Sequence, residues 1–296
     1  MVKYKSILKV IEQETNKCKA TARALKIGES FEETENGYKY SDGTQITLDD
    51  YGDIKSITLP NGETLEYMQG EDNFHGKDHE FFKPQKDYLI NKHGEETYKE
   101  LCEFSDKWAS WRGIAINQYL YGSITYEQLE ERFNKAYEQV KGFHGEKEFH
   151  GNGKEELEWM LETEKKFNKI CSETPLTQYG SPFFSVRGTR LYDNDQITKK
   201  IVSYNGHTSA STGISHDDSR MFTGGEDGWK IITVYETDNK AGNGLFLGNL
   251  KNDNNYGVSM DWEHELHSAP KQKFERTMID EEHHYIIQKP YKPNME

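Results

Sequence analysis

Residues 256 to 278 read Y-G-V-S-M-D-W-E-H-E-L-H-S-A-P-K-Q-K-F-E-R-T-M, with two glutamates at the centre of the run. Glu263 and Glu265 are separated by His264 alone. Side chains of a strand alternate between its two faces, so both carboxylates would share one face, roughly 6 to 7 Å apart. Acids at that spacing repel each other, which raises the pKa of one or both. Such a pair suits chemistry through a sugar cation, and the alternative is a solvated strand face in an acidic protein.

The composition excludes some classes of protein. The chain has 296 residues, with 37 Lys and Arg against 51 Asp and Glu, and a net charge of -14. This balance argues against a protein that binds nucleic acid by neutralising phosphates, but not against a basic cleft for a small phosphorylated ligand. Aromatic residues make up 12% and can fill a sizeable core. Cys18, Cys102 and Cys171 are far apart, which indicates buried thiols in a reducing compartment.

Neither a membrane span nor a signal peptide is expected. No apolar run approaches the length of a membrane span, and residues 1 to 10 contain charges but no apolar h-region. We therefore expect no membrane partner. The protein is expected in the cytoplasm where it is made, or delivered by a route that reads no signal peptide, as for a phage-injected or secreted effector.

The first 80 residues differ from the rest in their pattern of apolar and turn-forming residues. Apolar residues recur at helical spacing from Lys5 to Lys26, which predicts an amphipathic helix. From Phe31 to Met68, Asn-Gly and Asp-Gly pairs separate short alternating runs, which predicts a β-meander with tight turns. Polar residues 69 to 84 form a linker. His75 and His79 in it lack a third ligand, so no metal is expected. Residues 1–80 are therefore predicted to be a small module of unassigned role.

The remainder, residues 81–296, is predicted to be one α+β domain. Its first part, 86–172, has helical periodicity, and Thr125 with Gln128 forms a capping box. The apolar residues that step by three or four through this part are Tyr98, Leu101, Phe104, Trp108 and Trp111. Residues 176–291 contain runs of strand character without long helices between them, which favours a mixed β-sandwich over a parallel sheet.

Three motifs follow one another in this second part. A predicted strand ends in Arg187-Gly188, another enters Thr208-Ser209-Ala210-Ser211, and a third carries Glu263-His264-Glu265. This order resembles the arginine–serine–glutamate class of mono-ADP-ribosyltransferases, which includes actin-modifying binary toxins and phage enzymes. The glycine turn in 240–248 and the apolar–proline–aromatic run in 266–274 are also similar to that family.

The resemblance covers about residues 88 to 291, and the sequence departs from the family's pattern within it. Ala210 replaces the middle threonine of the serine motif. His267 and Ser268 occupy positions where the family prefers aliphatic residues. Both serines of the motif, Ser209 and Ser211, are present.

The resemblance implies a β-sandwich of ADP-ribosyltransferase type that uses NAD as substrate, without a metal. Arg187, together with Gly188, Thr208 and Ser209, would bind the dinucleotide, because a guanidinium fork suits its phosphate or the neighbouring ribose. Ser209 would brace Glu265 by a hydrogen bond. Glu265 would stabilise the oxocarbenium ion that forms as nicotinamide leaves.

The resemblance also implies the acceptor. Glu263 would orient a protein arginine and take its proton, helped by the bidentate fit of carboxylate and guanidinium. Tyr256 and Trp262 would contact the target protein. Two alternatives remain open: a related NAD glycohydrolase, and a non-catalytic β-rich protein in which the glutamates are surface charge.

Overall fold

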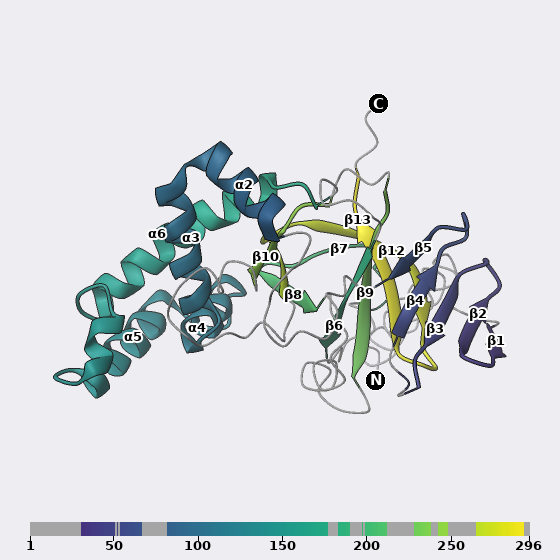
Figure 1. Ribbon diagram of the computed structural model, residues 1–296. Helices are drawn as coiled ribbons and strands as arrows, with labels where there is room; N and C mark the ends of the chain where they lie inside the picture. Colours follow the sequence, from purple (N-terminus) through teal and green to yellow (C-terminus); the bar gives the residue numbers. More distant parts are fainter. Residues whose placement is uncertain are drawn as a thin grey trace, which may run out of the picture.

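The structure of the protein is a computed structural model that describes residues 31–50, 52, 54–66, 82–176, 183–189, 197, 199–211, 228–237, 242–247 and 265–292. It confirms the predicted α+β class: a block of helices lies beside a curved, mixed sheet (Figure 1). The helix predicted over 5–26 and the two linker histidines, His75 and His79, lie outside the described residues. Within the described residues, no helix has the length and apolarity to cross a bilayer, and no three His, Cys, Asp or Glu side chains group as metal ligands.

The predicted meander forms five antiparallel strands. They are β1 (Phe31–Thr34), β2 (Gly37–Tyr40), β3 (Gln45–Leu48), β4 (Ile54–Thr58) and β5 (Thr64–Glu66). Gly37 at the start of β2 and the turn residues Gly43 and Gly62 have positive φ, which glycine adopts without the steric cost of a Cβ. The Asn-Gly and Asp-Gly pairs that contain these glycines therefore lie at tight turns, as the sequence predicts.

Later strands extend the same sheet. They are β6 (Phe183–Thr189), β7 (Ile201–Ser203), β9 (Trp229–Tyr235), β12 (Lys273–Asp280) and β13 (Tyr285–Pro290). A parallel bridge between Glu66 and Phe183 joins β5 to β6, and the order continues β6-β9-β13-β12-β7. β7 is short, and its three residues pair with Lys273–Glu275 of β12.

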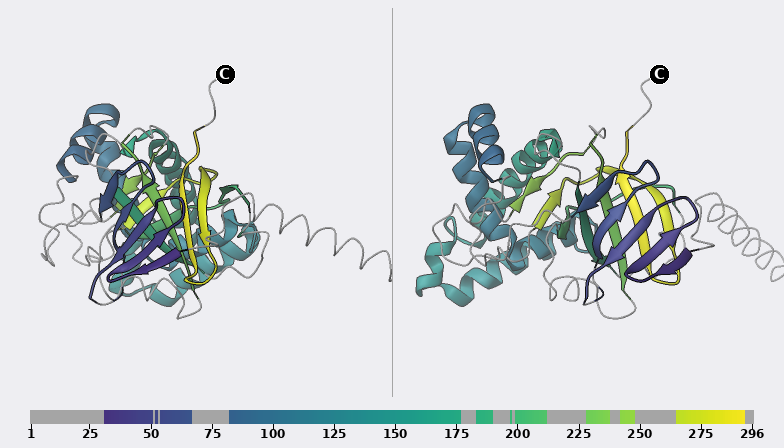
Figure 2. Two further views of the ribbon diagram at one scale, coloured as in Figure 1. Left: turned by 90° about the vertical axis from the view of Figure 1, so that its right-hand side faces the viewer. Right: turned by 45° about the vertical axis from the view of Figure 1, so that its right-hand side comes forward.

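The curved sheet closes over one apolar core. The meander strands lie over β9, β12 and β13 (Figure 2), and Ile46, Ile57 and Leu65 are completely buried among residues of those strands. Tyr40 crosses this core and donates a hydrogen bond to the Asp280 carboxylate at 2.7 Å. Residues 31–66 therefore share their core with 183–290, while the predicted domain boundary near residue 81 stays a prediction.

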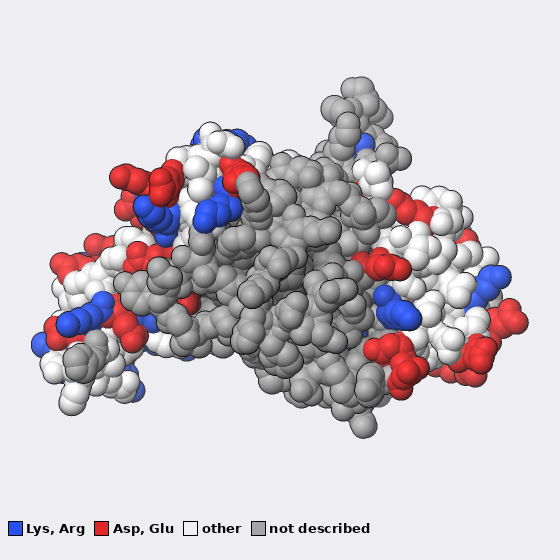
Figure 3. Space-filling view, in the orientation of Figure 1, with Lys and Arg blue, Asp and Glu red and all other residues white. Residues whose placement is uncertain are grey.

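The helical block contains α2 (Phe82–His93), α3 (Glu95–Trp108), α4 (Trp111–Leu120), α5 (Tyr126–Val140), the 3-10 turn η1 (His144–Glu148) and α6 (Gly153–Glu173). The capping box of Thr125 and Gln128 opens α5 as predicted. A second box, Asn152 with Glu155, opens α6. On the face drawn in Figure 3, acidic and basic side chains are interspersed over this block and over the meander.

The apolar stripe of α3 is confirmed except at its end. Tyr98, Leu101, Phe104 and Trp108 are buried, but Trp111 is 38% exposed. Ser110 caps a new helix at this point by accepting a hydrogen bond from the Arg112 backbone, so α4 turns Trp111 out of the stripe. Periodicity fails here because the helix ends between the two tryptophans.

A short branch of the sheet lies between the helices and β6 (Figure 1). It consists of β8 (Thr208–Ser211), β10 (Leu245–Phe246) and β11 (Glu265–Ser268). Leu245 packs in the helical core with Phe104 and Phe167, whereas Leu266 packs on Phe183. This branch therefore joins the helical block to the main sheet.

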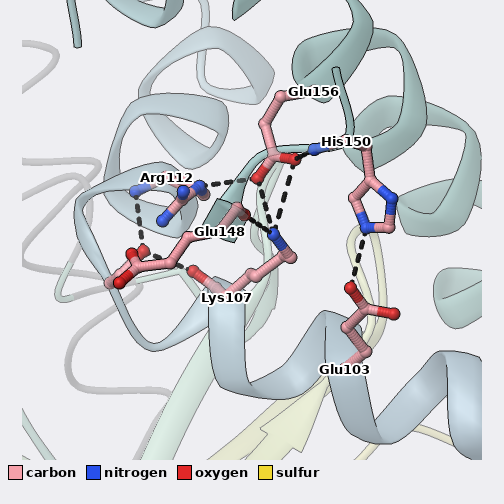
Figure 4. A network of polar contacts seen from close by, with 7 residues as sticks. Glu103, Lys107, Arg112, Glu148, His150 and Glu156 are labelled. Carbon is pink, nitrogen blue, oxygen red and sulfur yellow. Dashed lines mark hydrogen bonds and ion pairs between the residues drawn. The ribbon is translucent and has the colours of Figure 1, made fainter. Parts of the chain in front are cut away.

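A buried carboxylate holds the helical block together (Figure 4). Glu156 of α6 is completely buried, and its Oε1 lies 2.7 Å from Arg112 Nε and 3.1 Å from Lys107 Nζ. Its Oε2 accepts a hydrogen bond from the His150 backbone at 2.8 Å. Glu103 lies 2.8 Å from the same His150 ring. One anion thus links α3, α4, α6 and the turn before α6.

Replacing Glu156 by glutamine should lower the free energy of unfolding by about 3 kcal/mol, because two buried cations lose their counter-charge. Glu158→Gln on the same helix is the matched control. Glu158 is exposed and 3.9 Å from Lys154, so its loss should cost less than about 0.5 kcal/mol. Urea unfolding followed by circular dichroism compares the variants, and equal losses would contradict the role of Glu156.

Candidate active site

The strands of the three motifs adjoin one another. β8 pairs with β6 on one side, where Ser211 lies opposite Val186, and with β11 on the other, where Ser211 lies opposite Glu265. Arg187 is the next residue of β6 after Val186. Segments up to eighty residues apart in the sequence are thereby neighbours in one sheet, with β8 in the middle.

The Arg187 guanidinium is held by two tyrosines. Its Cζ lies 5.4 Å from the centre of the Tyr204 ring, and the side chain of Tyr121, the residue directly after α4, shares a hydrogen bond with it. Burial raises the pKa of Tyr121, so that phenol is neutral beside the cation. Nη1 of Arg187 is buried, and within the described part of the chain it has no hydrogen-bond partner.

Helix α4 fixes the start of β8. The Asn117 amide donates to the His207 carbonyl at 3.0 Å and accepts from the His207 backbone N–H at 2.9 Å. A Cβ added to Gly206 would collide with Asn117 and with the ring of Tyr121. The chain before β8 is therefore pressed against α4 beside the tyrosine that holds Arg187.

Helix α6 contacts His207 from another side. His207 Nε2 lies 2.7 Å from Glu164 Oε1, and both side chains are almost completely buried. Burial raises the pKa of Glu164. Burial, with a smaller contribution from His267, lowers the pKa of His207 to about 2. His207 is therefore a neutral imidazole that shares a hydrogen bond with a buried carboxyl group.

Ser209 lies opposite His267 in the pairing of β8 with β11. The hydroxyl of Ser209 is 3.4 Å from His267 Nδ1, and Ser209 is exposed whereas His267 is completely buried. The Cys171 thiol donates to the His267 carbonyl at 3.2 Å. Sequence reasoning noted His267 only as a departure from the family's pattern and missed its contact with the serine motif.

The structure describes the remaining predicted site residues unevenly. Gly188 pairs with Lys230 in the β6–β9 ladder, and Thr208 is buried opposite Ser268. The backbone of Glu265 opens β11 opposite Ser211, the second serine of the motif, whereas Ser209 lies opposite His267. Three further predicted residues lie outside the described residues: Glu263, Tyr256 and Trp262. The site roles of all these residues stay predictions.

No protein family matches the sequence, and no curated protein matches it. Several of the solved structures to which the chain is similar are of ADP-ribosyltransferases. The Vis toxin from Vibrio splendidus is 14% identical over 77% of this chain and 91% of its own, with a TM-score of 0.41. An ADP-ribosyltransferase from Clostridium botulinum is 12% identical over 73% and 97%, with a TM-score of 0.37. Exoenzyme S from Pseudomonas aeruginosa, in complex with human 14-3-3 protein beta and bound to carba-NAD, is 14% identical over 73% and 95%, with a TM-score of 0.32. At identities and TM-scores this low, the function proposed below rests on the residues of this chain.

The His207 imidazole should make folding sensitive to acid. Its folded-state pKa lies far below the ordinary 6.5, so the unfolded chain binds more protons as the pH falls below 6.5. This group should therefore remove about 1.4 kcal/mol of stability for each pH unit below 6.5. The raised pKa of Glu164 acts the other way, because the stability from its protonated form is lost as the pH rises above 4.5.

Urea unfolding of the wild type and of His207→Gln between pH 7 and pH 5 measures this effect. Glutamine keeps a hydrogen-bond donor for Glu164 but does not titrate, so the variant's stability should fall less steeply. His93→Gln is the control, since partial burial lowers the pKa of His93 less. Parallel curves for the wild type and His207→Gln would refute the explanation.

Proposed function

We propose that this protein transfers ADP-ribose from NAD to an arginine side chain of a target protein and releases nicotinamide. The main observation in support of this proposal is that β8 pairs with β6 and with β11. These three strands bear Arg187, Ser209 and Glu265, the three residue types of the arginine–serine–glutamate class, and no neighbouring strand separates them.

Arg187 would hold the dinucleotide. Its Nη1 is buried and has no hydrogen-bond partner among the described residues. A phosphate oxygen could accept a charge-assisted hydrogen bond from this nitrogen. Tyr121 and Tyr204 already fix the guanidinium, so little side-chain freedom is lost on binding. Gly188 next to it lets a ligand approach the backbone, and Thr208 with Ser209 begins the adjoining strand.

The proposed reaction breaks the bond between nicotinamide and ribose C1. The electron pair of that bond leaves with nicotinamide, and Glu265 stabilises the positive charge that develops on the sugar. A guanidinium nitrogen of the acceptor then bonds to C1, and Glu263 takes the proton that this nitrogen loses. A charged guanidinium is a poor nucleophile, so a carboxylate base beside it addresses the main difficulty of the transfer.

The acceptor would be recognised by the segment before the two glutamates. Tyr256 and Trp262 there are proposed to contact the target protein, since an aromatic ring can stack on an arginine. A protein that modifies another protein in this way would act as a toxin or effector of phage or bacterial origin.

Labelled NAD and agmatine test the proposal, with release of nicotinamide and labelling of agmatine as the expected results. Glu265→Gln should lower both by at least about 100-fold, because a neutral amide cannot offset the developing charge. Glu281→Gln, in an exposed turn after β12, is the control and should keep wild-type activity. Nicotinamide release without labelled acceptor would identify an NAD glycohydrolase instead. No release and no NAD binding by calorimetry would favour a non-catalytic protein.

Arg187→Lys should raise KM for NAD by roughly tenfold and change kcat less, because a point charge replaces a two-pronged donor. Lysine also gives up the planar stacking on Tyr204. The matched control is Arg132→Lys, an exposed residue of α5 bonded to Gln118, for which neither constant should change. Steady-state kinetics measures both constants, and an unchanged KM for Arg187→Lys would remove Arg187 from the binding site.

A further inference from the structure

His267 is a buried polar residue that has no role in the reaction proposed above. It lies on β11, two residues after Glu265, and is completely buried. The rings of Trp108 and Phe167 pack edge-on against it, with centroids 5.7 and 5.2 Å away. Placing an imidazole among aromatic rings costs desolvation free energy that an aliphatic side chain would not cost. A buried polar group of this kind calls for a specific role.

The exposed neighbour of that ring is Ser209. The two residues lie directly opposite each other in the β8–β11 ladder, with 3.4 Å between the hydroxyl oxygen and Nδ1. Hydrogen bonds of active sites are often this long without a ligand and shorten when one binds. A serine hydroxyl can accept one hydrogen bond while it donates another, so a donor at Nδ1 would leave the hydroxyl proton free.

Two further residues keep the His267 ring in place. The His207 ring lies 4.7 Å from it, and His207 is itself tied to Glu164 of α6 at 2.7 Å. Burial lowers the pKa of His207, so this neighbour is an uncharged imidazole. A row of contacts therefore leads from Glu164 in the helical block through the two histidine rings to the exposed Ser209 of β8.

We propose that His267 is a positioning residue whose Nδ1–H donates to the Ser209 hydroxyl and so directs the Ser209 proton toward the Glu265 carboxylate. The inference rests on the proposed function, because it gives Ser209 its bracing role at Glu265. Ser209 lies diagonal to Glu265 across the ladder, a separation within reach of long side chains. A chain of donors that ends on an anion is cooperative, because each bond polarises the next.

The inference separates activity from stability. His267→Leu should lower kcat for NAD turnover by about tenfold, the usual effect of one lost hydrogen bond, while thermal stability stays equal or rises. His267→Asn should restore most of kcat, since its amide can donate from nearly the position of Nδ1. A merely structural histidine predicts the reverse order, with leucine the better replacement in the apolar surroundings. His93→Leu, at the end of α2, is the control.

A double-mutant cycle tests whether His267 acts through the serine. In the Ser209→Ala background, His267→Leu should cause no further loss of kcat, because the hydroxyl it positions is gone. Additive losses would overturn the proposal. Nitrogen NMR of histidine-labelled protein gives a readout that needs no activity, and a proton found on Nε2 but not on Nδ1 of His267 would also overturn it.

The outcomes distinguish this inference from the proposed function. A wild-type protein that neither binds nor cleaves NAD contradicts both. A wild-type protein that transfers ADP-ribose while His267→Leu keeps full kcat contradicts the positioning role alone. Transfer with a tenfold loss in His267→Leu, recovery in His267→Asn and no further loss in the double variant supports both.

Discussion

The hydrogen bonds between Asn117 and His207 are the contact on which the site depends most. Helix α4 and the residue directly before β8, ninety positions apart in the sequence, are joined there by two bonds, one in each direction. β8 is only four residues long and its own ladders are short, so it needs an external support to keep its register. With β8 held, β6 and β11 can pair on its two sides and bring Arg187 near the strand of Glu265.

Much of the fold could be predicted because its signals are local. The capping box at Thr125 needs only residues one turn apart, and the glycine turns of the meander need only a positive φ. The buried stripe of α3 follows from a period of 3.6 residues. The period wrongly included Trp111 in the stripe, because Ser110 caps a new helix before it. The cap is a local signal, but the apolar spacing alone does not reveal it.

The unpredicted features are long-range pairings. Nothing near Glu66 indicates that it will bridge to Phe183 and join the meander to the later strands. The order of the three motif strands could be inferred only through a resemblance, because alternation gives a strand's faces but not its neighbours. His267 was conspicuous as a polar residue in an apolar position, yet its contact with Ser209 depends on the register of two strands that sequence does not specify.

The guanidinium groups of Arg112, which is buried, and of Arg187, which is half-buried, have different surroundings. Arg112 shares with Lys107 a carboxylate that is also hydrogen-bonded to the backbone, so the helical block contains its own counter-charge. Arg187 receives only two tyrosine rings from the described residues. Nη1 of Arg187 is buried and has no hydrogen-bond partner among the described residues. A buried nitrogen without a partner costs desolvation free energy, so this arrangement suits the anion-binding role that we propose for Arg187.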